Sequence, residues 1–186
     1  ESDLIELQKE LESFGVKAFI KASDFSRKAD VLSFIAFVKS SFNKIDVVVN
    51  NAGVFLPATL LDESDETFEL QQILNLNSAY YMAKEFGKIM RNQSSGHIFN
   101  ICSIASKAVI ENAGSYSVTK AAMLSLNNVL RKELAQYNVK VTAILPGSTL
   151  TASWDGTTWH THGLQPSDIN SIKTFETFIE EIFQNL

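Results

Sequence analysis

The sequence is short of the residue types that build disulfide scaffolds, metal sites and membrane spans. Its 186 residues include one cysteine, three histidines and three prolines. The single thiol, Cys102, cannot form an intrachain disulfide, and with three scattered imidazoles it does not make a convincing zinc motif. No apolar run approaches the ~18 residues that a membrane-spanning helix needs. We therefore expect a metal-free protein in which Cys102 is a small core residue.

The sequence also has no large excess of charges of one sign. The formal net charge is −5, and acidic and basic residues are scattered rather than blocked. This pattern disfavours nucleic acid or an acidic membrane surface as the main partner. Hydrophobic residues make up 45% of the chain, which is enough for one domain, residues 1–186, with a sizeable core. We expect a soluble protein of the reducing cytoplasm.

Apolar periodicity predicts strands that alternate with amphipathic helices. Helices are expected at 2–13, 28–41, 66–76, 78–91 and 115–136. Strands with apolar residues on both faces are expected at 16–22, 45–49, 97–102 and 139–145. This alternation is typical of an α/β fold with a doubly wound parallel sheet and helices on both faces. Further on, we expect a substrate loop at 148–163 and an edge strand, rather than a helix, at 177–183.

Polar or turn-forming residues follow four of the predicted strands. They are Asp24, Asn51, Ser103 and the pair Pro146-Gly147. Ligands of parallel α/β sheets bind at the carboxyl ends of the strands. One crevice is therefore expected to collect these residues.

Tyr116 and Lys120 are spaced i, i+4 at the start of a predicted helix, so their side chains lie on one face. An ammonium beside a phenol favours the phenolate and lowers the phenol pKa from its reference value of ~10. Such a phenol can exchange a proton with an alcohol or carbonyl whose oxygen is held by Ser103. The alternatives are an amphipathic Tyr–Lys pair without chemistry, and a Ser103 that only caps a helix or forms a turn.

Five motifs follow one another along the chain. They are Asn50-Asn51-Ala52-Gly53, Asn75-Leu76-Asn77-Ser78-Ala79-Tyr80, Ser103, Tyr116 with Lys120, and Pro146-Gly147 with Thr151. In this order and at these intervals they resemble the short-chain dehydrogenase/reductase family. One such motif alone is a weak signal, whereas five at the family's spacing are a strong one. The resemblance covers roughly residues 16–151 and implies a Rossmann-like fold.

The resemblance implies hydride transfer between the nicotinamide of NADP(H) or NAD(H) and a small carbonyl or alcohol. Tyr116 would be the general acid or base, Lys120 would lower its pKa and bind the nicotinamide ribose, and Ser103 would hold the substrate oxygen. Asn75 would hold a water that completes a proton relay. The cofactor would be bound by Asp24, Phe25, Asn51, Ala52, Gly53, Pro146, Gly147, Thr149 and Thr151, together with Tyr116 and Lys120.

Several of these residues have purely structural alternatives. Asn51 and Gly53 could serve only their turn, and Asp24 could only cap a helix. Asn75 could only kink a helix, and Thr151 could be an ordinary loop residue. The sequence alone leaves these alternatives open.

Small residues on two predicted helices suggest close packing against another subunit. They are Ala79, Ala83, Gly87, Ala121, Ala122 and Ser125. The resemblance likewise implies a homodimer or homotetramer.

The family's glycine-rich turn, T-G-x-x-x-G-x-G, is missing from the sequence. This turn would precede Glu1 and cradle a pyrophosphate. We therefore expect the sequence to be an incomplete record of a longer enzyme, with residues also lost near Ile172. The residue that separates NAD from NADP would lie before Glu1 as well. NADP is expected as the commoner coenzyme of reductive members, and NAD stays open.

The main alternative to an enzyme is an NAD(P)-binding regulatory protein of the same fold that has lost turnover. The intact set of Asn75, Ser103, Tyr116 and Lys120 favours the enzyme. An esterase that uses Ser103 is disfavoured because the sequence has no G-x-S-x-G elbow.

Overall fold

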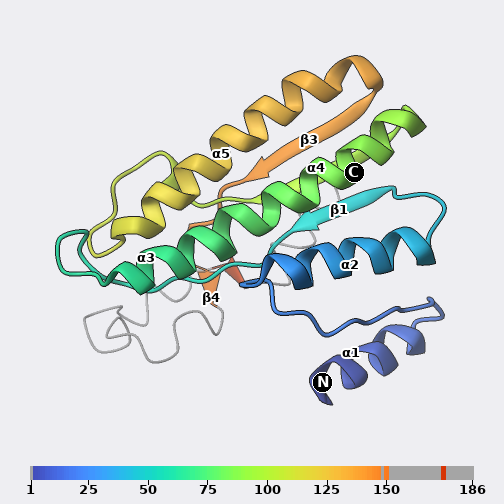
Figure 1. The fold of residues 1–186 in the computed structure, drawn as a ribbon, viewed down its shortest axis with the longest axis horizontal. Coiled ribbons are helices and arrows are strands. Elements are labelled where there is room, and N and C mark those ends of the chain that lie inside the picture. The colour runs from blue at the N-terminus through green and yellow to red at the C-terminus, as the bar shows by residue number, and fades with distance from the viewer. Residues whose placement is uncertain (1, 148, 151–172, 175–186) are drawn as a thin grey trace.

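The computed structural model describes residues 2–147, 149–150 and 173–174. Figure 1 shows its elements in order along the chain. They are α1 (Ser2–Ser13), α2 (Lys28–Ser41), β1 (Val47–Asn50), α3 (Asp65–Gln72), the π-helical turn η1 (Ile73–Asn77), α4 (Ser78–Gln93), β2 (Gly96–Ile101), the 3₁₀ turn η2 (Ile104–Ser106), α5 (Gly114–Leu134), the 3₁₀ turn η3 (Ala135–Tyr137), β3 (Val139–Ile144), β4 (Thr149–Leu150) and β5 (Lys173–Thr174).

The centre of the fold is a parallel sheet in the order β1-β2-β3. Its register sets Val48 beside Ile98, and Ile98 beside Val141. Because all three strands run the same way, their carboxyl ends meet at one edge of the sheet. The predicted parallel sheet of a Rossmann-like fold is confirmed. A separate parallel pair joins β4 with β5. β4 lies in the segment expected to be a loop, 148–163, and β5 lies after it.

Helices α2, α4 and α5 cover one face of this sheet (Figure 1). The covered core includes Val31, Ile35, Val48, Met82, Phe86, Met90, Ile98 and Val141. Burying a large apolar side chain such as Phe86 contributes ~1.5–3 kcal/mol. On the opposite face of β1, Val47 and Val49 are 42% and 46% exposed. The alternation of buried and exposed residues along β1 thus follows the pleat.

The predicted helices lie where the periodicity places them, with small shifts at their ends. The helices expected at 66–76 and 78–91 are joined through η1 into one continuous run from α3 to α4. Ser64 caps α3 by accepting a hydrogen bond from Thr67 N at 3.2 Å. Gly15 follows α1 with a φ of +80°, the left-handed geometry expected of a glycine there.

The strand predicted at 16–22 is wrong for this structure, which assigns no strand to these residues. An apolar alternating segment becomes a strand only when a neighbour supplies ladder hydrogen bonds. Within the described residues, no strand pairs with this segment. Its Ala18 carbonyl instead accepts a hydrogen bond from Gln8 Nε2 of α1 at 2.8 Å.

The small residues of α4 do not form a free surface for another subunit. Ala79 and Ala83 are 5% and 0% exposed and belong to the interior of this chain. A Cβ at Gly87 would lie 3.5 Å from Leu134 and 3.9 Å from Ile98, so this glycine lets α4 approach β2 and α5. The prediction that Ala79, Ala83 and Gly87 pack against another subunit is therefore wrong. Ala121 and Ser125 of α5 are exposed, and the oligomeric state stays a prediction.

The described residues contain neither a membrane-spanning helix nor a cluster of metal ligands. The helices within these ranges include none that is both long and apolar enough to cross a membrane. The same residues contain no group of three or more metal-ligating side chains. The residues expected to form the rest of the loop at 148–163 and the strand at 177–183 lie outside the described part of the chain.

Glu85 links α2 to α4. Its carboxylate accepts hydrogen bonds from Lys39 of α2 and from Lys88 of α4, each at 2.6 Å. The hydrogen bonds from Lys39 and Lys88 lower the pKa of Glu85 from 4.5 to about 2. Since this pKa is depressed in the folded state, the stabilisation is present above pH 4.5 and is lost as the pH falls toward about 2.

Replacing Glu85 by glutamine is expected to lower the free energy of unfolding at pH 7 by ~1 kcal/mol or less, because the pairs lie at the surface. Urea denaturation at pH 7 and pH 3 checks this: the difference between wild type and variant should shrink at pH 3. Glu69→Gln, at an exposed carboxylate of α3, is the control. An equal difference at both pH values would contradict this account.

Candidate active site

Tyr116 and Ser103 face each other from two different elements. Tyr116 lies in the first turn of α5, whereas Ser103 follows β2 and caps η2. Ser103 Oγ accepts a hydrogen bond from Ala105 N at 3.1 Å, and Ser106 Oγ accepts one from Ser103 N at 3.2 Å. The Ser103 side chain lies close enough to the Tyr116 hydroxyl to lower the pKa of the phenol by hydrogen bonding. The structure thus brings together the two hydroxyls that the sequence predicts to share a substrate oxygen.

Lys120 lies one turn further along α5, on the same side as Tyr116. Its Nζ is 5.7 Å from the centroid of the Tyr116 ring. The ammonium donates a hydrogen bond to the Ile101 carbonyl at the end of β2, with a distance of 2.9 Å. Lys120 is only 6% exposed. The i, i+4 spacing therefore places phenol and ammonium together, as predicted.

The predicted lowering of the Tyr116 pKa is not found in this structure. Burial raises the pKa of Tyr116, a hydrogen bond with Ser103 opposes this rise, and the nearby Cys102 adds to it. Burial also lowers the pKa of Lys120, while Cys102 acts in the opposite direction. The physical reason is desolvation, which disfavours the charged form of both groups. With the protein alone, Tyr116 is therefore held as a neutral phenol.

Asn75 lies in η1 and is 1% exposed. Its Oδ1 accepts a hydrogen bond from Val54 N at 2.7 Å, and its Nδ2 donates to Val54 O at 2.9 Å. The same Nδ2 donates to Thr119 Oγ1 at 3.2 Å, and Thr119 directly precedes Lys120. A π-helical turn inside a helix is rare and is found often at functional sites. Asn75 thus occupies a helix irregularity beside the residues of α5.

Gly53 lies directly beside the side chains of Asn75 and Lys120. A Cβ at Gly53 would lie 2.7 Å from Asn75 Oδ1 and 3.7 Å from Lys120 Nζ. Real Cβ atoms essentially never come as close as the first of these distances. The turn after β1 therefore approaches the site through a residue without a side chain.

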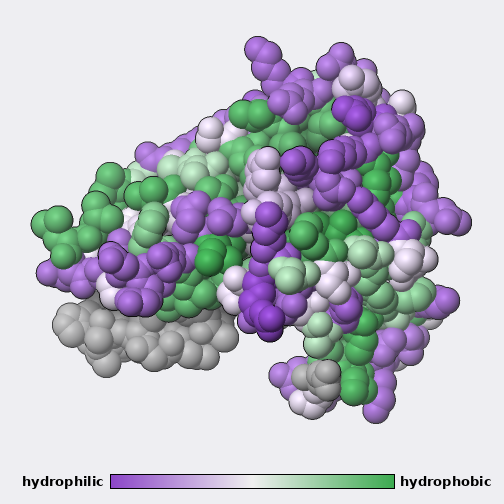
Figure 2. Space-filling model, viewed as in Figure 1, coloured by the Kyte–Doolittle hydropathy of each residue, from purple (hydrophilic) through white to green (hydrophobic). Residues whose placement is uncertain are grey.

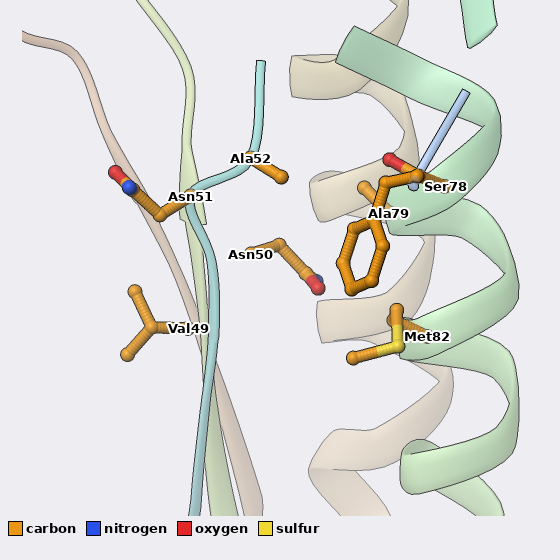
Figure 3. A pocket seen from close by; sticks show the side chains of 8 residues that line it. Val49, Asn50, Asn51, Ala52, Ser78, Ala79 and Met82 are labelled. Atoms are coloured by element: carbon orange, nitrogen blue, oxygen red, sulfur yellow. The ribbon is translucent and has the colours of Figure 1, made fainter. Parts of the chain in front are cut away.

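A hollow of about 250 Å³, open to solvent, lies between the end of β1 and the start of α4. It is lined by Phe25, Val49, Asn50, Asn51, Ala52, Ser78, Ala79 and Met82. Figure 3 shows that Asn50 and Ala52 point toward α4, whereas Val49 and Asn51 point away from it. Small side chains at Ala52 and Ala79 keep this wall thin, so a flat ring could approach the backbone. The lining includes Phe25, Asn51 and Ala52, three of the residues predicted to bind the adenosine end of a dinucleotide.

Asp24 is exposed and does not line this hollow. Its carboxylate accepts hydrogen bonds from Ser26 N at 2.9 Å and from Ser26 Oγ at 2.6 Å. The Ser26 hydroxyl, the Ser26 N–H and Arg27 lower the pKa of Asp24, in this order of strength. The structure thus gives Asp24 a turn-stabilising contact ahead of α2, and Phe25 is the neighbour that reaches the hollow.

Pro146 is held beside the segment that carries Ser103. Its carbonyl accepts a hydrogen bond from Ile104 N at 3.0 Å, and Cys102 N donates to Ile144 O at 2.8 Å. The Pro146-Gly147 turn therefore lies at the same sheet edge as the hydroxyls. Thr149 belongs to β4, whereas Thr151 lies outside the described residues.

Residues that sequence reasoning did not single out also reach the site. The Phe55 ring meets the Tyr116 ring edge-on, with centroids 4.8 Å apart. Thr119 connects the Asn75 amide to the Tyr116 carbonyl, to which its hydroxyl donates at 2.9 Å. Thr119 could have been found from its place between Tyr116 and Lys120, one helical turn after Tyr116. Phe55 carries no such signal, because a loop conformation decides where it points.

Comparison with known proteins shows the family to which this fold belongs. A family model described as short chain dehydrogenase matches residues 1–160. The chain belongs to the short-chain dehydrogenase family. An uncharacterized oxidoreductase of Staphylococcus saprophyticus is 35% identical over 172 residues, which are 91% of this chain and 73% of that protein. The diacetyl reductase [(S)-acetoin forming] of Staphylococcus epidermidis is 34% identical over 158 residues, which are 83% of this chain and 61% of that enzyme.

A solved structure shows the same fold. The crystal structure of a metagenomic short-chain oxidoreductase in complex with NADP superposes with a TM-score of 0.74 at 28% identity. The match covers 79% of this chain and 67% of that one. The present chain thus spans about two thirds of the length of the short-chain dehydrogenases that it matches.

The Tyr116 pKa can be measured in the protein alone. Ultraviolet difference spectra of wild type against Tyr116→Phe should show one phenol that ionises only above pH 10, its ordinary value, because burial raises its pKa. Tyr137→Phe, at an exposed tyrosine, is the control. A phenol assigned to Tyr116 that ionises near neutral pH would contradict the role of burial.

Gly53→Ala should destabilise the protein by ~1–3 kcal/mol, because the new methyl group would push the buried Asn75 amide off its Val54 partners. The matched control is Gly147→Ala, where a Cβ would meet nothing within 4 Å. Urea denaturation compares the two variants. If Gly53→Ala and Gly147→Ala have equal free energies of unfolding, the Asn75 side chain moves aside without loss of stability.

Proposed function

We propose that this protein is an oxidoreductase that transfers a hydride between a nicotinamide cofactor and a small carbonyl or alcohol. The observation that supports this most is that Ser103 and the buried Lys120 both lie close to Tyr116. Membership of the short-chain dehydrogenase family supports the same reaction.

In this proposal Tyr116 acts as general acid when the carbonyl is reduced and as general base when the alcohol is oxidised. Its raised pKa keeps the phenol protonated at neutral pH, the form required for reduction. Ser103 donates a hydrogen bond to the substrate oxygen and fixes it beside the phenol. Asn75, through its bonds to Val54 and Thr119, holds the turn after β1 against α5.

Lys120 has two roles in the proposal. Its ammonium supplies a positive charge near the phenol, which stabilises negative charge that develops on the phenol or the substrate oxygen during proton transfer. It also remains a donor for a ribose hydroxyl, because its Ile101 bond uses one of three N–H groups.

The cofactor we propose is NADP, with NAD possible, and it supplies the hydride. Phe25, Asn51, Ala52 and Gly53 would hold its adenosine end, with Asp24 in the turn beside them. Pro146, Gly147, Thr149 and Thr151 would hold the nicotinamide end, together with Tyr116 and Lys120. The NADP complex of the metagenomic short-chain oxidoreductase supports this choice.

The substrate we propose is a small ketone, aldehyde or alcohol, and diacetyl is the first compound to test. The relative named as a diacetyl reductase supports that choice. We also propose that the protein is cytoplasmic and forms homodimers or homotetramers, with the exposed small residues of α5 in the contact.

Tyr116→Phe is expected to lower turnover at least ~10²-fold, because the general acid is lost. Binding of NADPH should remain within about a factor of two, since only one hydroxyl is removed; nicotinamide fluorescence measures it. Tyr137→Phe is the matched control and should keep full turnover of diacetyl. Binding of NADPH without turnover by the wild type, on diacetyl and on a panel of ketones and aldehydes, would favour a silent regulatory protein instead.

A further inference from the structure

Helix α5, which carries Tyr116 and Lys120, begins without a cap from its own sequence. Its N-cap residue, Ala113, makes no side-chain hydrogen bond. The cap comes instead from Glu63, which lies 52 residues before Ser115. Glu63 Oε2 accepts hydrogen bonds from Ser115 Oγ at 2.6 Å and from Ser115 N at 3.4 Å. A carboxylate is well suited to this end of a helix, where N–H groups are free and the helix dipole is positive.

Gln71 links Ser115 to the loop that precedes Glu63 through two hydrogen bonds. Gln71 Nε2 donates to Ser115 Oγ at 2.7 Å, and Gln71 Oε1 accepts from Leu56 N at 3.2 Å. Both Gln71 and Ser115 are 0% exposed. In such buried surroundings, losing one partner leaves another polar group unsatisfied, which costs ~1–3 kcal/mol.

The loop 54–63 lies directly on the start of α5. Ala58 O accepts a hydrogen bond from Gly114 N at 3.0 Å, and Ala58 N donates to Asn112 O at 3.0 Å. A Cβ at Gly114 would lie 2.8 Å from Leu60 N, so this contact leaves no room for a side chain. The loop and the helix end are thus fixed against each other at several points.

The Phe55 ring belongs to the same loop and packs edge-on against the Tyr116 ring. On either side of Phe55, the loop backbone is held by a buried amide side chain: Asn75 bonds Val54, and Gln71 bonds Leu56. The orientation of the Tyr116 ring therefore depends on two supports, the first turn of α5 and the loop 54–63. Ser115, bonded by both Glu63 and Gln71, joins these supports.

We propose that Glu63 is a positioning residue for Tyr116, which it aims at the substrate oxygen by fixing Ser115 and the loop 54–63. The inference rests on the proposed function of Tyr116 as general acid. Glu63 acts through hydrogen-bond geometry, so an uncharged acceptor of the same length replaces it. A small displacement of a catalytic group is costly: ~1 Å can lower the rate ~10²-fold.

The test compares Glu63→Leu, which removes the acceptor, with Glu63→Gln, which keeps it. With NADPH and diacetyl as probes, Glu63→Leu should lower kcat at least ~10-fold, while KM for NADPH stays within about a factor of two. Glu63→Gln should keep at least about a third of wild-type kcat. Glu111→Leu, which removes an exposed carboxylate three residues before α5, is the control and should leave kcat unchanged.

Circular dichroism gives the folded fraction by which kcat is corrected. If Glu63→Leu only lowers stability and leaves corrected kcat within about twofold of wild type, Glu63 is a helix cap alone and the inference is overturned. It is also overturned if Glu63→Gln loses as much kcat as Glu63→Leu. Ser115→Ala provides a second variant should Glu63→Leu not fold, and the same loss of kcat is expected.

The inference and the proposed function fail differently. If the wild type binds NADPH and reduces no carbonyl, the proposed function fails. In that case, amide hydrogen exchange at residues 115–117 tests whether Glu63 orders the first turn of α5. Faster exchange in Glu63→Leu than in Glu63→Gln and wild type supports Glu63 as the group that orders this turn, and equal exchange in all three overturns it.

Discussion

The hydrogen bond between Lys120 Nζ and the Ile101 carbonyl is the interaction on which the site depends. It joins α5 to the end of β2 at the level where Ser103 leaves the strand. In the described sheet β2 lies between β1 and β3, and Ile101 at its end pairs with Ile144 of β3. The ammonium therefore has a rigid partner, and the phenol one turn earlier on α5 is brought to the Ser103 hydroxyl.

Burial gives this arrangement its chemical character. A buried ammonium loses hydration, and its bond to Ile101 offsets part of that cost. The phenol beside it is kept neutral by the same desolvation. In such surroundings, electrostatic interactions are stronger than in water, so hydroxyl and ammonium groups can act strongly on a bound oxygen. The apolar surroundings that stabilise α5 on the sheet also set the protonation states of the site.

The sequence was sufficient to predict those parts of the fold and site that follow from local periodicity. A spacing of four on a helix places Tyr116 and Lys120 on one face, and parallel strands bring Ser103 and the Pro146 turn to one edge. Local patterns could not reveal that segment 16–22 lacks a neighbouring strand in the described structure. Nor could they reveal that Glu63 caps a helix which begins 51 residues later, because a loop conformation creates this contact.

The site as a whole is tested most directly by following the transferred hydrogen. The wild-type protein would be incubated with diacetyl and NADPH that carries deuterium at the transferable position of its nicotinamide, and acetoin would be examined by mass spectrometry and NMR. One deuterium on the carbinol carbon of acetoin is the predicted result. Two results would contradict hydride transfer at Tyr116 and Ser103. The first is acetoin without deuterium, whichever face of the nicotinamide carries the label. The second is no acetoin or other alcohol from any carbonyl offered.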